Sequence, residues 1–229
     1  MMFHNLIIPR LPSRHREAFS LVELLFVIAI IGLLATATVP ALNSITDGGN
    51  ASSSTLKLAS FLEQARQYAT AQNTYVYISF LPRDSGGPEA SLWVTAVASN
   101  SGSDIAARGT KSFVVGSGDA EGRQLTHTLK LNGMVTEKKG QIPLSAVSRP
   151  DPAQSVEPID TGASTFGPIG GATFPIGFWF SPDGSASTDS DVPTRIELAI
   201  RPDVRPDPKW ASVIQIAGLT GSVHVYRSE

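Results

Sequence analysis

The pattern of apolar and polar positions divides the chain into one long apolar run and a longer part in which the two kinds of residue mix. The run covers residues 18–41, AFSLVELLFVIAIIGLLATATVPA, and contains a single charged residue, Glu23. From Phe19 to Val39 it supplies 21 residues, or about 31 Å of α-helix at 1.5 Å per residue. This length matches the roughly 30 Å hydrocarbon core of a bilayer. The run therefore predicts a transmembrane helix over residues 19–41.

The residues before the run set the expected orientation of this helix. Residues 1–18 carry three arginines and one glutamate, and positive charges beside an apolar run stay on the cytoplasmic side. The run is longer than the apolar part of a secretory signal, and no small-residue cleavage pattern closes it before Pro40. We therefore expect a single-pass membrane protein with a cytoplasmic N-terminus and an extracytoplasmic C-terminal domain; the family resemblance described below implies the inner membrane and, for the domain, the periplasm.

After the run, two local signals predict an interruption of the helix. Pro40 removes a backbone donor, and residues 47–50, Asp-Gly-Gly-Asn, form a second helix-breaking signal. Residues 52–55 then offer N-cap side chains for a new amphipathic helix. We expect residues 42–73 as a whole to form an amphipathic helical segment. Its apolar positions recur every three or four residues and form one face that packs on a sheet: Leu58, Phe61, Leu62, Ala65, Tyr68 and Ala69.

From Thr74 onward the pattern is that of β-strands. Val76, Ile78 and Phe80 alternate with their neighbours and predict one apolar face of a first strand over residues 74–80. Residues 100–109 and 149–175 predict surface loops, and the last two strands predict a hairpin around Leu219 and Thr220. The further strands are expected at 91–98, 111–115, 125–131, 142–147, 174–181, 194–200, 210–217 and 221–227. This is an α+β chain whose residues 74–229 form a mainly antiparallel β domain.

Composition and motifs offer little chemistry. The net charge of −2 argues against a nucleic-acid protein held by bulk electrostatics, and without cysteine there are no disulfides or thiolate metal sites. The four histidines are far apart, and the aspartates at 183, 189 and 191 do not follow a calcium-loop spacing. A basic, aromatic strip over residues 201–210 is interrupted by Asp203 and Asp207. We expect no catalytic residue, no metal, no cofactor and no nucleic-acid partner.

Residues 18–23, Ala-Phe-Ser-Leu-Val-Glu, resemble the cleavage and methylation signature of type IV prepilins and type II secretion pseudopilins. In that family a small residue, usually Gly, precedes a Phe, a Glu stands fifth after the cut, and a proline is common at position twenty-two. Ala18 replaces the usual Gly here. The resemblance implies that a prepilin peptidase cuts between Ala18 and Phe19 and methylates the Phe19 amine. It also implies that Glu23 pairs with the amine of a neighbouring subunit, and that Pro40 kinks the helix. Ser20 and Glu23 also match a helix capping box, which is compatible with this role.

Two further segments narrow the resemblance. Residues 62–69, LEQARQYA, and residues 180–185, FSPDGS, are similar to segments of the H-type minor pseudopilins and related minor pilins. The combination also looks like the pilin-like D member of the Verru_Chthon cassette proteins. The resemblance implies a pilin-like fold, in which one long N-terminal helix, transmembrane and then amphipathic, packs on an antiparallel β domain. The implied partners are the prepilin peptidase, other pilins or pseudopilins, the inner-membrane assembly platform and membrane lipid.

These expectations describe a non-enzymatic subunit. It has a leader peptide at residues 1–18, an assembly helix at 19–41 and an outer domain, and it serves as a minor component of a type II secretion pseudopilus. Two alternatives stay open at this point. One is a minor type IV pilin for DNA uptake or adhesion. The other is a signal-anchored protein whose β domain binds a ligand or is an enzyme too divergent to be recognised from its sequence.

Overall fold

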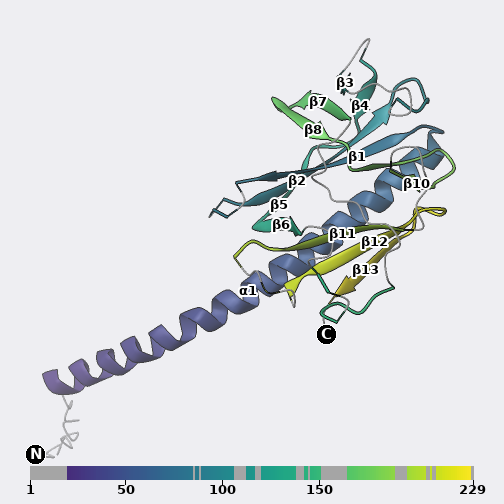
Figure 1. Ribbon diagram of the computed structural model, residues 1–229. Helices are drawn as coiled ribbons and strands as arrows, with labels where there is room; N and C mark the ends of the chain where they lie inside the picture. The colour runs from purple at the N-terminus through teal and green to yellow at the C-terminus, as the bar shows by residue number, and fades with distance from the viewer. Residues whose placement is uncertain are drawn as a thin grey trace, which may run out of the picture. The chain divides into compact units, whose positions relative to one another are not determined.

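A computed structural model describes residues 20–84, 86–87, 89–105, 112–116, 120–137, 142–143, 145–150, 164–188, 195–204, 207 and 210–227, with residues 35–48 described by their backbone alone. The chain separates into two compact units, Met1–Ile45 and Thr46–Glu229. One α-helix and thirteen β-strands make up the regular structure of the described residues (Figure 1). Residues 1–19, which include the predicted cleavage position, lie outside the described residues.

The helix α1 runs without interruption over Leu21–Ala71. The prediction that a new helix starts at residues 52–55 is therefore wrong, and so is the prediction that residues 47–50 end the first one. Thr55 does not cap a new helix, because its hydroxyl donates to the carbonyl of Ala51 at 2.8 Å, four residues back inside the same helix. Both residues are buried, so tertiary packing keeps these turns helical despite the local breaking signals. The kink at Pro40 stays a prediction, since the side chains of residues 35–48 lie outside the description.

The amphipathic face of α1 is confirmed. Its apolar side chains between Leu58 and Ala69 are buried or half-buried in the main core of the second unit. The helix ends beyond Ala71 where Asn73 takes a positive φ of 49°, a conformation typical of helix C-termini. The Thr74 amide then donates to the Ala69 carbonyl at 3.0 Å. This closure turns the chain directly into the first strand.

The largest sheet contains six strands in the described part of the chain, in the order β10-β9-β1-β2-β4, with β5 also paired to β2. All of these pairings are antiparallel. Residues of β1 pair in register with β2 from Val76 opposite Ala98 to Arg83 opposite Ser91. The strands are β1 (Val76–Arg83), β2 (Ser91–Ser99), β4 (Gly122–Gln124), β5 (Leu129–Asn132), β9 (Phe178–Phe180) and β10 (Ala186–Ser187).

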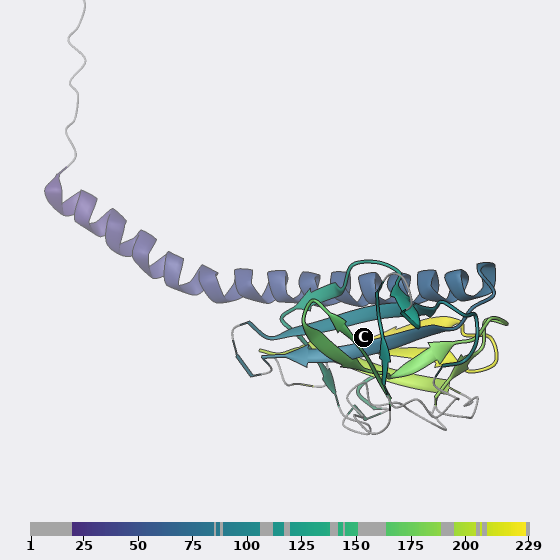
Figure 2. The same cartoon turned by 90° about the horizontal axis from the view of Figure 1, so that it is seen from above.

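Two smaller sheets complete the second unit. The four-stranded sheet has the order β13-β12-β11-β6, formed by β6 (Met134–Glu137), β11 (Arg195–Pro202), β12 (Ser212–Ala217) and β13 (Val223–Arg227). The three-stranded sheet joins β3 (Ser112–Val114), β7 (Thr165–Ile169) and β8 (Ala172–Pro175), with β3 parallel to β7. Figure 2 shows the second unit's part of α1 lying along one side of these sheets. The α+β class, with a long N-terminal helix on mainly antiparallel sheets, is confirmed.

Strand β1 is buried on both of its faces. Val76, Ile78 and Phe80 point into the main core with the apolar face of α1, as their alternation predicts. Tyr77, on the opposite face, lies in a second apolar cluster between the large and the three-stranded sheet. The other fully or nearly buried members of that cluster are Val97, Ile105, Phe113, Phe166, Ile169, Phe174 and Trp179. The large sheet is therefore the middle layer of the second unit.

Several predicted strands are confirmed and others are not. Strands form at 91–99, 112–114 and 195–202, and the closing hairpin is formed by β12 and β13. The prediction of a strand at 142–147 is wrong, because the described residues form a turn in which the Ala146 amide donates to the Pro143 carbonyl at 3.0 Å. The prediction of one strand over 125–131 is also wrong. Two short strands, β4 and β5, pair with β2 there, and His127 lies between them.

The prediction of an unbroken loop over 149–175 is wrong for its last part. Residues 165–169 and 172–175 form β7 and β8, although glycines and prolines interrupt their apolar pattern. Phe166 and Phe174 are fully buried there and stack with ring centroids 6.1 Å apart. The burial of these two rings stabilises the segment as two strands. No local sequence pattern predicts this burial. Residues 151–163 lie outside the described residues.

Candidate functional site

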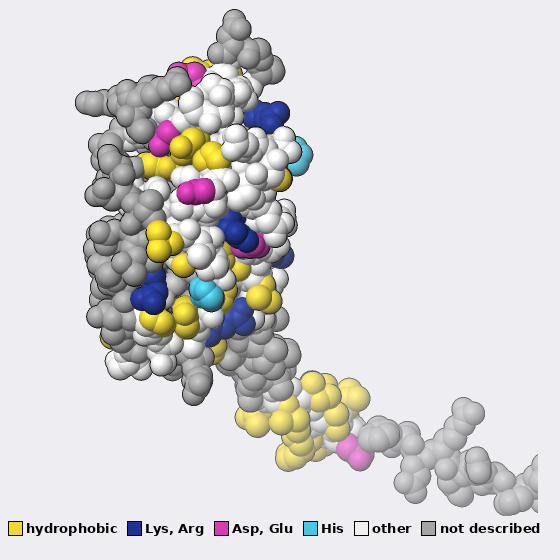
Figure 3. Space-filling model, turned by 90° about the vertical axis from the view of Figure 1, so that its right-hand side faces the viewer, with side chains coloured by type: hydrophobic (Ala, Val, Ile, Leu, Met, Phe, Trp, Pro, Cys, Tyr) yellow, Lys and Arg dark blue, Asp and Glu magenta, His cyan; other side chains and the backbone are white. Residues whose placement is uncertain are grey.

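The first unit presents an apolar helix surface around a single carboxylate. Ser20 precedes α1, and its carbonyl accepts the first helical bond from the Leu24 amide at 3.1 Å. All described side chains from residue 20 to residue 34 are exposed, and they are apolar except for Ser20, Glu23 and Gly32. Figure 3 shows these apolar side chains on the part of the helix that it displays. Glu23 stands in the first turn, where the positive end of the helix dipole favours a negative charge.

A helix that is apolar on every side is unfavourable when all of its side chains are exposed to water. Leu21 is 78% exposed, Leu33 is 72% exposed, and the large apolar residues between them are at least 45% exposed. Helices of this composition are buried inside a protein assembly or in a membrane. Within the residues that the structure describes, no helix is long and apolar enough to cross a membrane. Ala18 and Phe19, the predicted cleavage and methylation positions, lie outside the described residues.

The comparisons with known proteins bear on this same segment. Residues 13–39 match the family model described as the prokaryotic N-terminal methylation motif. The match supports a type IV pilin-like or pseudopilin-like protein, processed by a prepilin peptidase and assembled with other pilins. The match also supports a membrane-anchored, pilin-like protein. The matched residues contain Ala18, Phe19 and Glu23, while Pro40 follows directly after them. No curated protein and no solved structure matches the chain.

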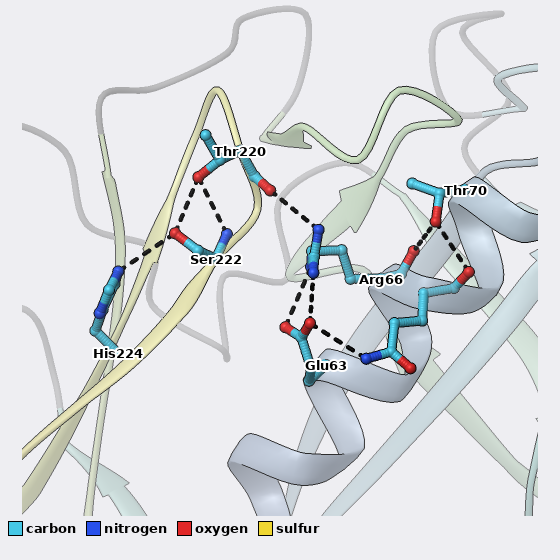
Figure 4. Close-up of polar contacts among 7 residues, drawn as sticks. Glu63, Arg66, Thr70, Thr220, Ser222 and His224 are labelled. Atoms are coloured by element: carbon cyan, nitrogen blue, oxygen red, sulfur yellow. Dashed lines mark hydrogen bonds and ion pairs between the residues drawn. The ribbon is translucent and has the colours of Figure 1, made fainter.

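In the second unit, the segments 62–69 and 180–185 meet at the tip of the terminal hairpin. Figure 4 shows Arg66 of α1 between Glu63 and the hairpin turn. The Arg66 Nη1 donates to the Thr220 carbonyl at 3.4 Å, its Nε donates to Glu63 Oε2 at 3.1 Å, and its Nη2 forms an ion pair with Glu63 Oε1. The hydrogen bonds with Arg66 lower the pKa of Glu63, and the same bonds raise the pKa of Arg66. We call this contact region the Arg66 junction.

The 180–185 turn shows why its aspartate and glycine occupy their places. Asp183 Oδ1 accepts from the Ser185 amide at 2.9 Å and from the Ser185 hydroxyl at 2.7 Å. These bonds, first the hydroxyl and then the amide, lower the pKa of Asp183. Gly184 has a φ of 86°, which favours glycine. Asp183 therefore stabilises the turn in which it lies. The other two aspartates considered for a calcium loop, at 189 and 191, lie outside the described residues.

The remaining candidates from the sequence have structural partners or lie outside the description. Arg201 forms an ion pair with Glu137, and Asp203 accepts from the Gly86 amide at 3.1 Å. Residues 205 and 209 of the basic strip are not among the described residues. Arg227, the arginine nearest the C-terminus, donates to the Ser52 hydroxyl at 2.7 Å. Among the described residues, no group of three or more His, Asp or Glu side chains is placed to hold a metal ion.

The sequence singles out both segments of the Arg66 junction, 62–69 and 180–185, but no pattern in it predicts that they contact each other. The predictions from sequence also missed Gly221, whose added Cβ would lie 2.2 Å from the Gly184 carbonyl oxygen and 2.8 Å from Arg66 Cδ. The one available signal was a glycine at the tip of the predicted hairpin. That signal predicts a turn and gives no information about the segments packed against it.

Proposed function

We propose that the chain is a structural subunit, cut between Ala18 and Phe19, methylated at Phe19 and assembled as a minor component of a type II secretion pseudopilus. One observation carries the proposal. Within the matched methylation motif, Glu23 is the only charge on a helix surface that is otherwise apolar and exposed over residues 21–34. In this proposal the subunit catalyses nothing. Before assembly, residues 19–41 anchor it in the inner membrane, with the second unit on the extracytoplasmic side.

Glu23 is the residue that a simple membrane anchor does not need. A carboxylate costs about 2.5–3.5 kcal/mol in the middle of a bilayer and less near the headgroups, where the first turn of residues 19–41 lies in this proposal. A simple anchor has no interaction that offsets even this smaller cost. Cleavage before Phe19 creates a positive amine four residues upstream of Glu23. An opposite charge held in a low-dielectric assembly offsets much of the desolvation of Glu23. We propose that the Phe19 amine of a neighbouring subunit supplies this charge, and that the assembly platform and membrane lipid complete the surroundings.

The processing step is tested by the intact mass of the chain isolated from cells with and without a prepilin peptidase. The expected product in the presence of the peptidase lacks residues 1–18 and carries one methyl group on Phe19. Replacing Ala18 with Gly, the family's usual residue, should raise the processed fraction or leave it complete. A chain that keeps residues 1–18 in both strains would refute the proposal.

The assembly step is tested with Glu23→Val. We expect normal membrane insertion but loss of co-assembly with the other pseudopilins, because the buried amine loses its partner charge. Glu121→Gln is the matched control, since it removes an exposed carboxylate from the second unit and should assemble normally. Filament incorporation is measured in sheared fractions by immunoblotting. Equal incorporation of the Glu23→Val chain would show that Glu23 has no assembly role.

A further inference from the structure

A basic and aromatic cluster stands on the outer face of the large sheet, on strands β1, β2 and β5. The pairing register puts Leu81 of β1 opposite Trp93 of β2, and Trp93 opposite Lys130 of β5. Their neighbours in the strands, such as Phe80, Leu92 and Leu131, belong to the main core on the other face. Because side chains alternate along a strand, Leu81, Trp93 and Lys130 share the outer face, together with Arg83, two residues beyond Leu81.

This end of the outer face is not closed by an apolar layer. The three-stranded sheet covers the other end, where Tyr77 and Val97 are fully buried. Leu81 and Trp93 lie at the margin of that second cluster and are only partly buried, whereas Arg83 and Lys130 are exposed. The surface therefore combines a half-buried indole with two solvated cations.

Trp93 holds both cations. The Arg83 guanidinium carbon lies 5.1 Å from the centroid of the Trp93 ring, and the Lys130 ammonium lies 4.4 Å from it. An aromatic ring face attracts a cation at this distance through the ring's quadrupole. These contacts also order the two long side chains in the free protein. Less conformational entropy is then lost when a ligand binds. The cluster is thus organised before any partner arrives.

Neither cation is neutralised by the described part of the chain. Arg66, Arg149 and Arg201 each have a carboxylate within the 4.0 Å ion-pair distance. In the described residues no such carboxylate accompanies Arg83 or Lys130, although Asp84 and Glu89 are close in sequence. An incoming anion would therefore gain two cations without displacing a carboxylate of the described residues.

We propose that Arg83, Trp93 and Lys130 form a docking site for an acidic segment of a partner protein. The two cations would bind its carboxylates, and Leu81 and Trp93 would accept an apolar side chain beside them. A protein segment is favoured over a nucleic acid because nucleic-acid binding depends mainly on many Lys and Arg contacts with phosphates, whereas this cluster offers two cations on a chain of net charge −2. The site lies in the second unit and does not depend on processing or on Glu23.

The test uses the purified full-length chain in a non-ionic detergent and a fluorescein-labelled poly-glutamate peptide, with binding followed by fluorescence anisotropy. We expect saturable binding at low salt that weakens as screening increases. The double variant Arg83→Ser/Lys130→Ser should weaken the affinity by about tenfold, the effect of losing two exposed ion pairs. Trp93→Leu should weaken it by a smaller factor, because the cations lose the ring that orders them.

The controls separate the site from bulk charge. Lys57→Ser removes an exposed cation from α1 and should leave the affinity unchanged, and circular dichroism should show that all variants fold. Absence of saturable binding, or equal affinities of the double variant and the Lys57→Ser control, would overturn the site. Unchanged affinity of the Trp93→Leu variant would overturn the part of the proposal in which the Trp93 ring orders the two cations. Tighter binding of a thymidine oligonucleotide of equal charge would overturn the assignment to an acidic protein. None of these outcomes bears on processing at Ala18.

Discussion

At Gly221 three segments approach so closely that a side chain has no room. Its φ is 61°, and a Cβ there would lie 2.2 Å from the Gly184 carbonyl oxygen and 3.2 Å from the Phe180 ring. Gly221 also donates from its amide to the Ala217 carbonyl at 2.7 Å. The hairpin turn is thus closed from within and pressed against the 180–185 turn. At the scale of single residues, this glycine is what allows the Arg66 junction to form.

Gly221→Ala tests the close approach, with Gly170→Ala as its matched control. Gly170 has a similar φ of 57° but nothing within 4 Å of an added Cβ. The control should lose about 1–3 kcal/mol of unfolding free energy from backbone strain alone, and Gly221→Ala about 1–3 kcal/mol more from the clash. Urea denaturation measures both. Equal losses would show that the hairpin tip moves away from Gly184 at little cost.

The Asp183 turn predicts a dependence of stability on acidity. Since hydrogen bonds from Ser185 lower the pKa of Asp183 in the folded chain, its contribution is present above the unfolded pKa of about 3.9 and is lost as the pH falls through the lower folded value. Asp183→Asn keeps an acceptor oxygen but does not titrate. The difference in melting temperature between the two chains should therefore hold from neutrality down to about pH 5 and shrink as the pH is lowered further. A difference that is also constant below that pH would contradict the proposed bonds.

At the scale of elements, α1 has two different surfaces within the second unit. Leu62 is 0% exposed and lies in the main core with the inner face of the large sheet, whereas Leu56 is 57% exposed. The Arg66 junction and the contact of Arg123 with the Tyr68 ring, at 5.6 Å, add polar attachments beside the apolar face. The burial of this face explains why the helix continues through residues that favour a break.

Leu62→Ala and Leu56→Ala separate the contributions of the two surfaces. Leu62→Ala should cost about 2–5 kcal/mol, because it leaves a cavity in the main core. Leu56→Ala makes the same chemical change on the same helix and should stay within about 0.5 kcal/mol. Chemical denaturation followed by circular dichroism gives both values. Similar costs for the two variants would mean that Leu56 is covered in solution.

At the scale of the whole molecule, a buried ion pair attaches a turn to the four-stranded sheet. Arg149 donates to both oxygens of Glu197 on β11, at 2.8 and 2.9 Å, and also donates to the carbonyls of Ile142 and Val147. The two side chains are 3% and 9% exposed. Gln215 donates to Glu197 and to the Pro150 carbonyl. Ile142 and Val147 form a third apolar cluster on this sheet.

Arg149→Met tests how much this attachment matters. It should cost about 3–5 kcal/mol, since it leaves the Glu197 carboxylate buried without its partner. Adding Glu197→Gln should recover part of the loss, because the neutral amide still accepts from Gln215 but carries no charge. Arg195 lies on the same strand as Glu197 and has no ion pair among the described residues. Arg195→Met should therefore leave the free energy of unfolding nearly unchanged. A double variant no more stable than Arg149→Met would point to lost packing of the arginine stem instead.

Local patterns in the sequence were sufficient for part of this protein. The apolar face of α1 from Leu58 to Ala69, the alternation of Val76, Ile78 and Phe80 and the closing hairpin depend on side-chain periodicity within a few turns or one strand. The methylation motif depends on the identity and spacing of neighbouring residues. Such features are readable because the physical cause lies within the segment itself.

Contacts between distant segments decided the rest. The continuity of α1 past residue 47 follows from burial of Ala51 and Thr55, and β7 and β8 exist because Phe166 and Phe174 pack against Tyr77's face of the large sheet. The Arg66 junction brings Arg66 to Thr220, and the Arg83–Trp93–Lys130 cluster brings Trp93 to Lys130, across long stretches of sequence. No local periodicity records such contacts, because their free energy comes from surfaces that meet only when the sheets and the helix have packed.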